Sequence, residues 1–465
     1  MNEKFLKLRN TYKTFIYHDY HIEDSEDNIK ITYDFEIVGL CEFHPTIEIK
    51  KKKIPFKSVE NDFVKNLVFN IGMVELVSYW KCACPENVIV KCGYLNEEQI
   101  NWFKKLYYNG QGEYRYINQI DISQEEMMNI TVEAPYCKIE DISQEEKKGT
   151  LIPIGGGKDS TVTLELLKKD KANNYCLMIG GKEPSMKCAK VAGYEDNQII
   201  EVTRTIDSEL LRLNKEGFLN GHTPFSSMLA FLSYFIAFLT DKKYIALSNE
   251  SSANESNVEG EKINHQYSKS YEFEQDFEYY SNKYLKAGVH YFSMLRPLNE
   301  LQIAKLFSRN KQYHQIFRSC NVGSKIVPWE WCGECPKCLF VFIILSPFLY
   351  KDELVAIFGK DLYQKENLLE TFKELCGYGK TKPFECVGTY EEVNYAITVT
   401  IKELEKEKTK LPYLLQFYKD NYELADTTKD ITKRYNEINS VPEEFDAILK
   451  ENILNVNWIN WTLKK

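Results

Sequence analysis

The sequence has no apolar run of the roughly 20 residues that a helix needs to cross a membrane. Its two most hydrophobic segments are 224–239 (PFSSMLAFLSYFIAFL) and 339–349 (LFVFIILSPFL). The first contains a proline and three serines, and Ser346 and Pro347 break the second. Both segments are therefore predicted to be buried core helices, and no membrane partner is expected.

The sequence also lacks an excess of positive charge. Its 59 Lys and Arg residues are outnumbered by 68 Asp and Glu residues, and the net charge of −9 is spread along the chain. A general nucleic-acid binder needs clustered cations at the phosphates, so nucleic acid is not an expected partner. A local basic pocket for a small anion is compatible with this balance.

A secretory leader is not evident either, because MNEKFLKLRNTYK at the start has no apolar core and no cleavage site. The 13 cysteines are then expected to be reduced thiols of a cytoplasmic protein rather than disulfides. With 465 residues, 43% of them hydrophobic, the chain can form two or three domains, or one large core with additions.

Three regions differ in their hydrophobic pattern. Residues 1–146 contain strand-like segments and one amphipathic segment that ends at Gly110, which predicts a β-rich α+β N-terminal domain. Residues 147–390 alternate short β-runs with helical segments, which predicts an α/β domain with a parallel sheet and right-handed crossovers. Residues 391–465 show helical periodicity without obvious chemistry and are predicted to be a helical C-terminal appendage.

A glycine cluster separates the first strand from the first helix of the central region, in LIPIGGGKDST (151–161). Glycines let the backbone approach a ligand, and free N–H groups at a helix start attract an anion, so phosphate binding is predicted. The loop is not a Walker A motif, because Asp159 follows Lys158, and not GxGxxG, because Ser160 stands at the third glycine position. A glycine-rich turn without a ligand is the alternative.

Polar clusters follow this loop at places where a structural role alone would not need them. They are GFLNGHTPFSS (217–227), SNESSANES (248–256), NHQYSKSYEFE (264–274) and RPLNE (296–300). Ligands of such sheets bind at the carboxyl ends of the strands, and SNESSANES follows the β-run KYIALS, so it is predicted to lie at the rim of a site. Each cluster taken alone also fits a turn, a helix cap or a solvated face.

Four cysteines are closely spaced as C-x11-C-x2-C-x2-C; they are Cys320, Cys332, Cys335 and Cys338. Four thiolates satisfy a tetrahedral Zn²⁺ ion. C-x2-C-x2-C also occurs in iron–sulfur ligation, but the C-x3-C-P element that follows there is missing from this sequence. A structural zinc site is predicted, with no open coordination position for catalysis.

The glycine loop resembles the SGGxDS loop of the PP-loop ATP pyrophosphatases. Gly156, Gly157, Asp159 and Ser160 match this motif, whereas Gly155 replaces its first serine and so lacks that hydroxyl. The resemblance implies a HUP-like, doubly wound parallel sheet. It also implies a loop that grips the β,γ-pyrophosphate of ATP in an enzyme that splits ATP into AMP and pyrophosphate.

A longer series of motifs resembles the UDP-N-acetyl-α-D-muramoyl-L-alanyl-L-glutamate epimerases, the MurL family. Over residues 30–392 these motifs are, in order, YWKCACP, YYNGQGEYRYIN, GGGKDS, LNGHTP, SNESSA, NHQYSKS, RPLNE, SCN, WCGECPKC and KPFECVG. The resemblance implies that the terminal L-Glu of UDP-MurNAc-L-Ala-L-Glu becomes D-Glu for peptidoglycan synthesis. ATP and Mg²⁺ would be required, and adenylation of the glutamate carboxylate would make the α-proton removable.

Site residues are predicted on the same grounds. The predicted nucleotide and Mg²⁺ ligands are Gly155, Gly156, Gly157, Lys158, Asp159 and Ser160, with Asn249, Glu250 and Ser252 at the rim. The predicted substrate ligands are Asn220, Arg296 and Lys382. The candidates for proton transfer are His222, His265, Lys269 and Cys386, since each can act as a base when its pKa is tuned. For Cys386, a role as a small buried apolar residue fits equally well.

Two other functions are still open at this point. One is a different PP-loop enzyme, such as a 7-cyano-7-deazaguanine synthase or a tRNA-modifying ATPase, and the negative net charge disfavours the latter. The other is a nucleotide sensor or scaffold protein with a zinc knuckle and a loop that hydrolyses nothing. Release of pyrophosphate would separate the sensor from both kinds of enzyme.

Overall fold

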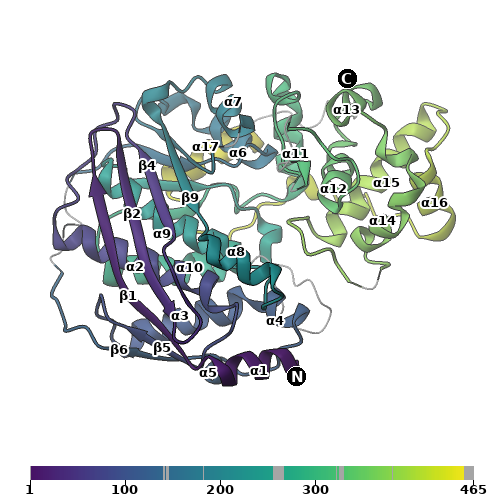
Figure 1. The fold of residues 1–465 in the computed structure, drawn as a ribbon. Helices are drawn as coiled ribbons and strands as arrows, with labels where there is room; N and C mark the ends of the chain where they lie inside the picture. Colours follow the sequence, from purple (N-terminus) through teal and green to yellow (C-terminus); the bar gives the residue numbers. More distant parts are fainter. Residues whose placement is uncertain are drawn as a thin grey trace.

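The computed structural model describes residues 2–139, 142, 146–181, 183–254, 267–320, 322–323, 329–379 and 381–454. It is a mixed α/β fold built on one eleven-stranded sheet (Figure 1). The strands are β1 Thr14–Asp24, β2 Asn28–Ile37, β3 Cys41–Phe43, β4 Thr46–Lys50, β5 Asn87–Val90, β6 Asn129–Val132, β7 Thr150–Pro153, β8 Tyr175–Ile179, β9 Ile199–Thr205, β10 Tyr244–Leu247 and β11 His290–Ser293.

Helices cover this sheet and extend beyond it. They are α1 Glu3–Thr11, α2 Asp62–Trp80, α3 Glu97–Gly110, α4 Gly112–Ile117, α5 Gln124–Met127, α6 Lys158–Leu166, α7 Glu183–Val191, α8 Ser208–Lys215, α9 Phe225–Leu239, α10 Tyr271–Tyr280, α11 Glu300–Arg309, α12 Pro336–Leu345, α13 Lys351–Phe358, α14 Leu369–Cys376, α15 Tyr390–Lys406, α16 Tyr413–Asn421 and α17 Glu443–Leu454.

The central region forms the parallel half of the sheet, as its alternating pattern predicts. The strands β11, β10, β7, β8 and β9 lie side by side in this order and run parallel. In chain order this is the arrangement 3-2-1-4-5, read from β9 to β11. The direction of winding changes between β7 and β10, and a ligand crevice is expected at the carboxyl ends of strands beside such a point.

The N-terminal strands continue the same sheet rather than forming a separate one. Strand β4 pairs antiparallel with β9, so that Ile47 lies opposite Arg204 and Ile49 opposite Val202. Beyond β4 the order is β2, β1, β5 and β6, with β3 paired to β2. The predicted boundaries at residues 146 and 390 stay predictions, because the sheet itself has no break at the first of them.

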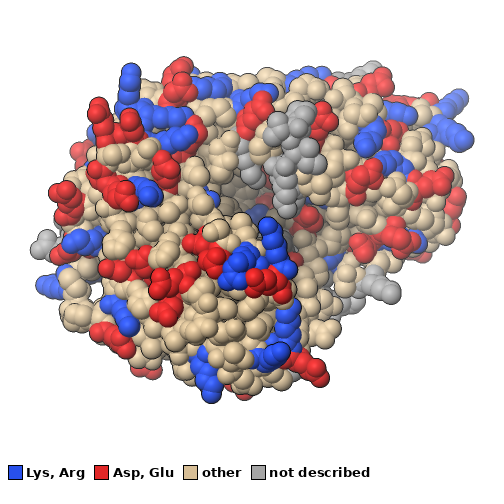
Figure 2. Space-filling model, viewed as in Figure 1, with Lys and Arg blue, Asp and Glu red and all other residues tan. Residues whose placement is uncertain are grey.

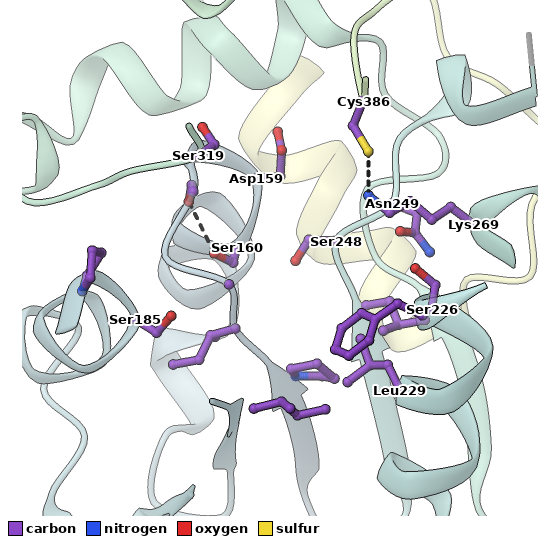
Figure 3. A pocket seen from close by; sticks show the side chains of 18 of the residues that line it. Asp159, Ser160, Ser185, Ser226, Leu229, Ser248, Asn249, Lys269, Ser319 and Cys386 are labelled. Carbon is purple, nitrogen blue, oxygen red and sulfur yellow. Dashed lines mark hydrogen bonds between the residues drawn. The ribbon is translucent and has the colours of Figure 1, made fainter. Parts of the chain in front are cut away.

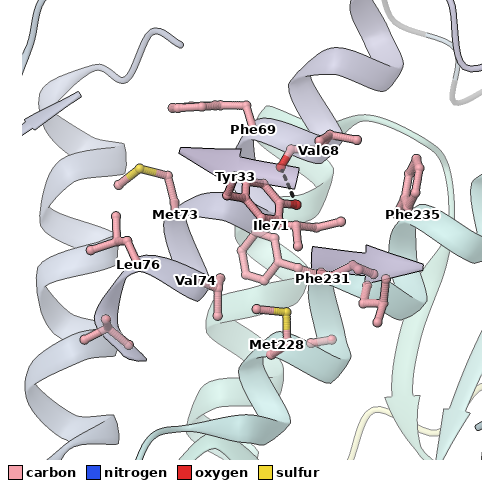
Figure 4. Close-up of a cluster of buried hydrophobic side chains, with 14 of the residues drawn as sticks. Tyr33, Val68, Phe69, Ile71, Met73, Val74, Leu76, Met228, Phe231 and Phe235 are labelled. Carbon is pink, nitrogen blue, oxygen red and sulfur yellow. Dashed lines mark hydrogen bonds between the residues drawn. The ribbon is translucent and has the colours of Figure 1, made fainter. Parts of the chain in front are cut away.

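Two hydrophobic cores lie on the two faces of the sheet. Alternation along each strand divides its side chains between them, so that Leu151 belongs to one core and Ile152 to the other. Helices α2, α9 and α10 contribute to the first core, where Phe231 packs and Tyr33 donates a hydrogen bond to the Val68 carbonyl at 3.2 Å (Figure 4). Helices α6, α7, α11, α12 and α15 contribute to the second core.

The two most apolar segments are buried, as predicted. Helix α9 is buried from Ala230 to Leu239, and α12 is buried from Lys337 to Leu345. Among the described residues, no helix is both long enough and apolar enough to cross a bilayer. On the face shown in Figure 2, basic and acidic side chains are interspersed, and the surface is hollowed between the sheet and the helices beside it.

The helices predicted after residue 391 are present as α15, α16 and α17. The first two join α12, α13 and α14 in a helical group beside the sheet (Figure 1). The last helix returns to the sheet, where the ring of Phe445 lies 4.9 Å from Tyr244 and 4.8 Å from Phe292. The C-terminal helices therefore pack on the same core that supports the parallel strands.

Candidate functional site

A cavity of about 650 Å³ opens at the carboxyl ends of the parallel strands. Ile154 after β7, Gly180 after β8 and the segment 247–250 at the end of β10 line it. Residues distant in sequence complete the lining, among them Ser319 and Cys386. The cavity lies beside the change in winding direction, where the strand order predicts a crevice.

The glycine loop forms one wall of this cavity. Gly155 and Gly157 line it, and Gly157 is the N-cap of α6. Gly156 has a φ of +77°, and a Cβ atom at this position would lie 2.7 Å from the backbone nitrogen of Ser185. A side chain is therefore excluded at 156. The first turn of α6 begins at this wall, and N–H groups at a helix start are able to attract an anion.

Lys158 lies beneath the loop and not in the cavity lining. Only 1% of its side chain is exposed, and its ammonium group binds the carboxylates of Asp159 and Glu300. Burial opposes the charge of Lys158, yet these two carboxylates outweigh burial and raise its pKa above the usual value. Burial raises the pKa of Glu300 to about 8, although Lys158 opposes this shift.

Asp159 does line the cavity, with a quarter of its side chain exposed (25%). Burial raises the pKa of Asp159, but the ammonium groups of Lys158 and Lys337 outweigh burial and hold it below the usual value. The carboxylate is therefore ionised at neutral pH. Ser160 lies next to it, with its hydroxyl donating to the Gly157 carbonyl at 3.1 Å (Figure 3).

Lys269 and Cys386 form a pair on the opposite wall, although 117 residues separate them in sequence. The Lys269 ammonium donates to the Cys386 sulfur at 3.0 Å (Figure 3). The Cys386 sulfur raises the pKa of Lys269 above its usual value, although burial lowers it. Lys337 donates to the Cys386 carbonyl and so fixes the backbone of this pair.

Arg296 is completely buried and is not among the lining residues. Its guanidinium donates to the Glu274 carboxylate at 3.0 Å, to the Glu250 carbonyl at 2.8 Å and to the Lys269 carbonyl at 2.6 Å. These bonds hold the two segments that carry Glu250 and Lys269 against each other. The structure thus places Arg296 behind the site, as a support of its wall.

The remaining predicted residues divide into rim and outer positions. Asn249 and Glu250 line the cavity, and the Asn249 amide donates to the Ser293 hydroxyl at 3.1 Å. Ser252 is buried and is not among the lining residues. His222 also lies outside it, with its Nδ1 atom 3.7 Å from a carboxylate oxygen of Glu113.

Two further predicted residues, Asn220 and Lys382, are not among the residues that line the cavity. Asn220 accepts a bond from Asn118 through its carbonyl, at 3.1 Å, in the loop before α9. Lys382 is buried, with its ammonium 5.5 Å from the centre of the Tyr390 ring. His265 lies outside the described residues.

Several lining residues had no predicted role, and four of them are Arg204, Arg318, Ser319 and Lys337. The Arg204 guanidinium donates to the Glu75 carboxylate at 2.8 and 2.7 Å, so its charge is already balanced. Two of the four stand next to predicted metal ligands in sequence: Ser319 precedes Cys320, and Lys337 precedes Cys338. This adjacency to the cysteine motif is the sequence feature by which Ser319 and Lys337 could have been predicted.

The four predicted metal ligands come together beside this wall. The Sγ atoms of Cys320, Cys332, Cys335 and Cys338 all lie within 4.8 Å of one another. Three of the separations are 3.7, 3.6 and 3.5 Å. A tetrahedron of thiolates about 2.3 Å from a zinc ion has edges of about 3.8 Å, whereas a disulfide bond is about 2.05 Å long. The set therefore fits a tetrahedral metal ion such as Zn²⁺.

Comparison with known families agrees with this geometry. The sequence model of the MurL N-terminal domain matches residues 7–294, and that of the MurL C-terminal domain matches residues 316–431. The chain belongs to the MurL family. The two matched regions carry the glycine loop and the cysteine cluster respectively, so the predicted family is confirmed.

Three similar proteins bear the name UDP-N-acetyl-alpha-D-muramoyl-L-alanyl-L-glutamate epimerase. The protein of Xanthomonas oryzae pv. oryzae is 33% identical over 342 residues, which are 72% of this chain and 74% of that protein. A Micromonospora protein is 32% identical over 339 residues, with the same two shares of 72% and 74%. A Salinispora tropica protein is 32% identical over 329 residues, or 70% of each chain.

Proposed function

We propose that this chain converts the terminal L-Glu of UDP-MurNAc-L-Ala-L-Glu to D-Glu, with ATP split into AMP and pyrophosphate. The name shared by the relatives supports the substrate and the epimerisation. The observation that carries the proposal is that the glycine loop and the Lys269–Cys386 pair line one cavity. The strand order 3-2-1-4-5 supports a PP-loop type of doubly wound core around it.

The phosphate groups of ATP would lie at the start of α6. Gly155 and Gly157 leave the backbone open to a ligand, the first turn supplies N–H donors, and Ser160 supplies a hydroxyl. Lys158 does not reach the cavity, because its ammonium group is paired with Asp159 and Glu300 under the loop. Asn249 and Glu250 at the end of β10 are placed to contact the nucleotide or the glutamyl substrate.

Asp159 has the properties of a Mg²⁺ ligand. It is ionised, it faces the cavity, and carboxylate oxygen is a ligand that Mg²⁺ prefers. When bound, Mg²⁺ neutralises charge on the β- and γ-phosphates. A single protein carboxylate is typical of magnesium sites completed by water and substrate phosphates.

The chemistry explains why an epimerase would use ATP. An oxygen of the glutamate α-carboxylate attacks the α-phosphorus, the bond to the β-phosphate breaks, and pyrophosphate leaves. The resulting acyl adenylate no longer carries the carboxylate charge and withdraws electrons, so the α-proton is more acidic, and each 1.36 kcal/mol removed from the barrier gives about tenfold in rate. The α-carbon loses its proton on one face and receives another proton on the opposite face, which inverts its configuration. Water then cleaves the mixed anhydride to AMP and the D-Glu product.

Cys386 is the proton acceptor in this proposal. An ammonium group 3.0 Å away favours the thiolate form of a cysteine, and only the thiolate is a base. Lys269 stabilises that thiolate and also lines the cavity. His222 is a weaker candidate, because it lies outside the lining and close to Glu113.

The proposed function is tested by pyrophosphate release with ATP and Mg²⁺. Release is expected with UDP-MurNAc-L-Ala-L-Glu and not with UDP-MurNAc-L-Ala, which lacks the glutamate. In D₂O, deuterium is expected at the glutamate α-carbon of the product. Release that is independent of the glutamyl substrate would exclude the epimerase, and no release at all would favour a sensor or scaffold protein.

Replacing Cys386 tests the proton acceptor separately. Cys386→Ser is expected to slow deuterium incorporation by at least about 100-fold, because general-base catalysis typically contributes 10²–10⁴. Substrate-dependent pyrophosphate release should persist, since adenylation does not need that base. Cys137→Ser, at an exposed cysteine, is the matched control. If Cys386→Ala and His222→Ala both incorporate deuterium at the unaltered rate, neither residue is the base.

A further inference from the structure

Ser319 lies directly over the glycine loop. A Cβ atom at Gly157 would stand 3.3 Å from the Cβ and 3.6 Å from the Oγ of Ser319. Ser319 lines the same cavity as Gly155, Asp159 and Ser160, and Figure 3 shows it beside the latter two. A residue from a segment about 160 positions away therefore completes the wall around the predicted phosphate site.

The Ser319 hydroxyl is buried and has no hydrogen-bond partner within the part of the chain that the structure describes. Leaving a buried hydroxyl without a partner is unfavourable, so each such group calls for an explanation, such as a bound water, ion or ligand. The partner is then expected to arrive from the cavity. A phosphate oxygen, which only accepts hydrogen bonds, is complementary to a hydroxyl donor.

The position of Ser319 is fixed from both sides. On one side, the backbone N–H of Arg318 donates to the Gly156 carbonyl at 2.8 Å, which ties this segment to the loop. On the other side, Cys320 belongs to the cysteine cluster. A donor held in this way loses little conformational freedom when it binds a ligand.

We propose that Ser319 donates its hydroxyl to the pyrophosphate portion of the bound nucleotide, which rests on the proposed function. It would supply from a second segment the hydroxyl that Gly155 lacks within the loop. Gly155 lies on the same cavity wall, and a Cβ atom there would meet no heavy atom within 4 Å. A hydroxyl on residue 155 or on residue 319 would thus donate to the same pyrophosphate group.

The first test measures binding of ATP·Mg²⁺ and of pyrophosphate·Mg²⁺ by calorimetry. Ser319→Ala is expected to raise both dissociation constants about tenfold, since a hydrogen bond to a charged acceptor is lost. Its thermal midpoint should stay equal or rise, because the change removes an unpaired buried hydroxyl. Ser233→Ala removes another unpaired buried hydroxyl, in α9 and outside the cavity lining, and should leave both constants unchanged.

The second test restores the donor from the loop. Gly155→Ser combined with Ser319→Ala should recover most of the lost affinity, whereas Gly155→Ala in the same background should not. Two results would overturn the role of Ser319 without affecting the proposed function. One is that Ser319→Ala binds both ligands as tightly as the unaltered protein. The other is that Gly155→Ser and Gly155→Ala restore the affinity of Ser319→Ala equally. If the unaltered protein binds neither ATP nor pyrophosphate, the proposed function fails and the role of Ser319 fails with it.

Discussion

At the scale of single residues, the two lysines of the site show what local sequence can and cannot indicate. Lys158 follows a glycine loop, which predicts a phosphate contact, but its ammonium binds Glu300, 142 residues away. Lys269 has no such motif beside it, yet it lines the cavity because Cys386 and Arg296 hold its segment there. The direction of a charged side chain depends on partners that are distant in sequence.

Gly156 is the residue of the loop that tolerates least change. Gly156→Ala places a Cβ atom 2.7 Å from the Ser185 nitrogen at a φ of +77°, where a side chain costs about 1–2 kcal/mol before any clash. The thermal midpoint is expected to fall and the dissociation constant for ATP·Mg²⁺ to rise.

Gly155→Ala is the control for this substitution, because nothing lies within 4 Å of a Cβ atom there. Its thermal midpoint should match that of the unaltered protein. Equal midpoints for both variants would contradict the tight approach of the loop to α7.

At the scale of elements, hydrophobic periodicity predicted individual helices and strands, but not which distant strands pair with each other. The amphipathic segment that ends at Gly110 is α3, and the alternating β-runs of the central region are β7 to β10. The same patterns did not reveal that β4 pairs with β9, since register between distant strands depends on tertiary packing. They also missed α2, which is buried almost all round and so lacks an amphipathic period.

Three helices meet at one buried ion cluster under the glycine loop. Lys158 of α6 binds Glu300 at the start of α11, and the Glu300 backbone N–H donates to Glu392 of α15 at 2.7 Å. Lys158→Met would leave the Glu300 carboxylate buried without its counter-ion. The free energy of unfolding is expected to fall by about 3–5 kcal/mol, as for other broken buried pairs.

The double variant Lys158→Met with Glu300→Gln should recover much of this loss, because residue 300 then carries no charge and Lys337 still offsets the charge of Asp159. Lys168→Met, at a partly exposed lysine near α6, is the control and should change unfolding by less than about 0.5 kcal/mol. Burial raises the pKa of Glu300 above its unfolded value, so stability should fall as pH rises from about 5 to 8. In Lys158→Met the fall should continue to higher pH, because the ammonium group no longer lowers that pKa. Denaturant titrations at several pH values measure the free energy of unfolding of the single variant, the double variant and the control. A double variant that is no more stable than Lys158→Met would contradict the pairing of Lys158 with Glu300.

At the scale of the whole molecule, the cavity is assembled from segments that only the complete fold brings together. The ends of the parallel strands supply the loop wall, the segment before the cysteine cluster supplies Ser319, and the segment after α14 supplies Cys386. The N-terminal region contributes indirectly, since Glu75 of helix α2 balances Arg204 in the cavity lining. Sequence motifs predicted most of these segments. That the segments lie side by side depends on long-range pairing, which no local sequence pattern encodes.

The cysteine cluster links the helical group to the cavity that we propose binds the nucleotide, so metal removal should affect both stability and binding. Zinc-site folding energies reach about 10–16 kcal/mol in small domains, and here the metal would hold the segment that carries Ser319. We expect one zinc per chain by elemental analysis. After chelation, the thermal midpoint should fall and the dissociation constant for ATP·Mg²⁺ should rise, and added Zn²⁺ should restore both.

Cys332→Ser should lose zinc and reproduce the chelated state, whereas Cys137→Ser at an exposed cysteine should retain one zinc per chain. Because Cys320 is bonded to Ser319 through the backbone, loss of metal should weaken nucleotide binding in the unaltered protein more than in Ser319→Ala. That difference separates a metal that positions the phosphate donor from one that only stabilises the fold. Undiminished ATP binding by the metal-free protein would show that the cluster and the glycine loop act independently.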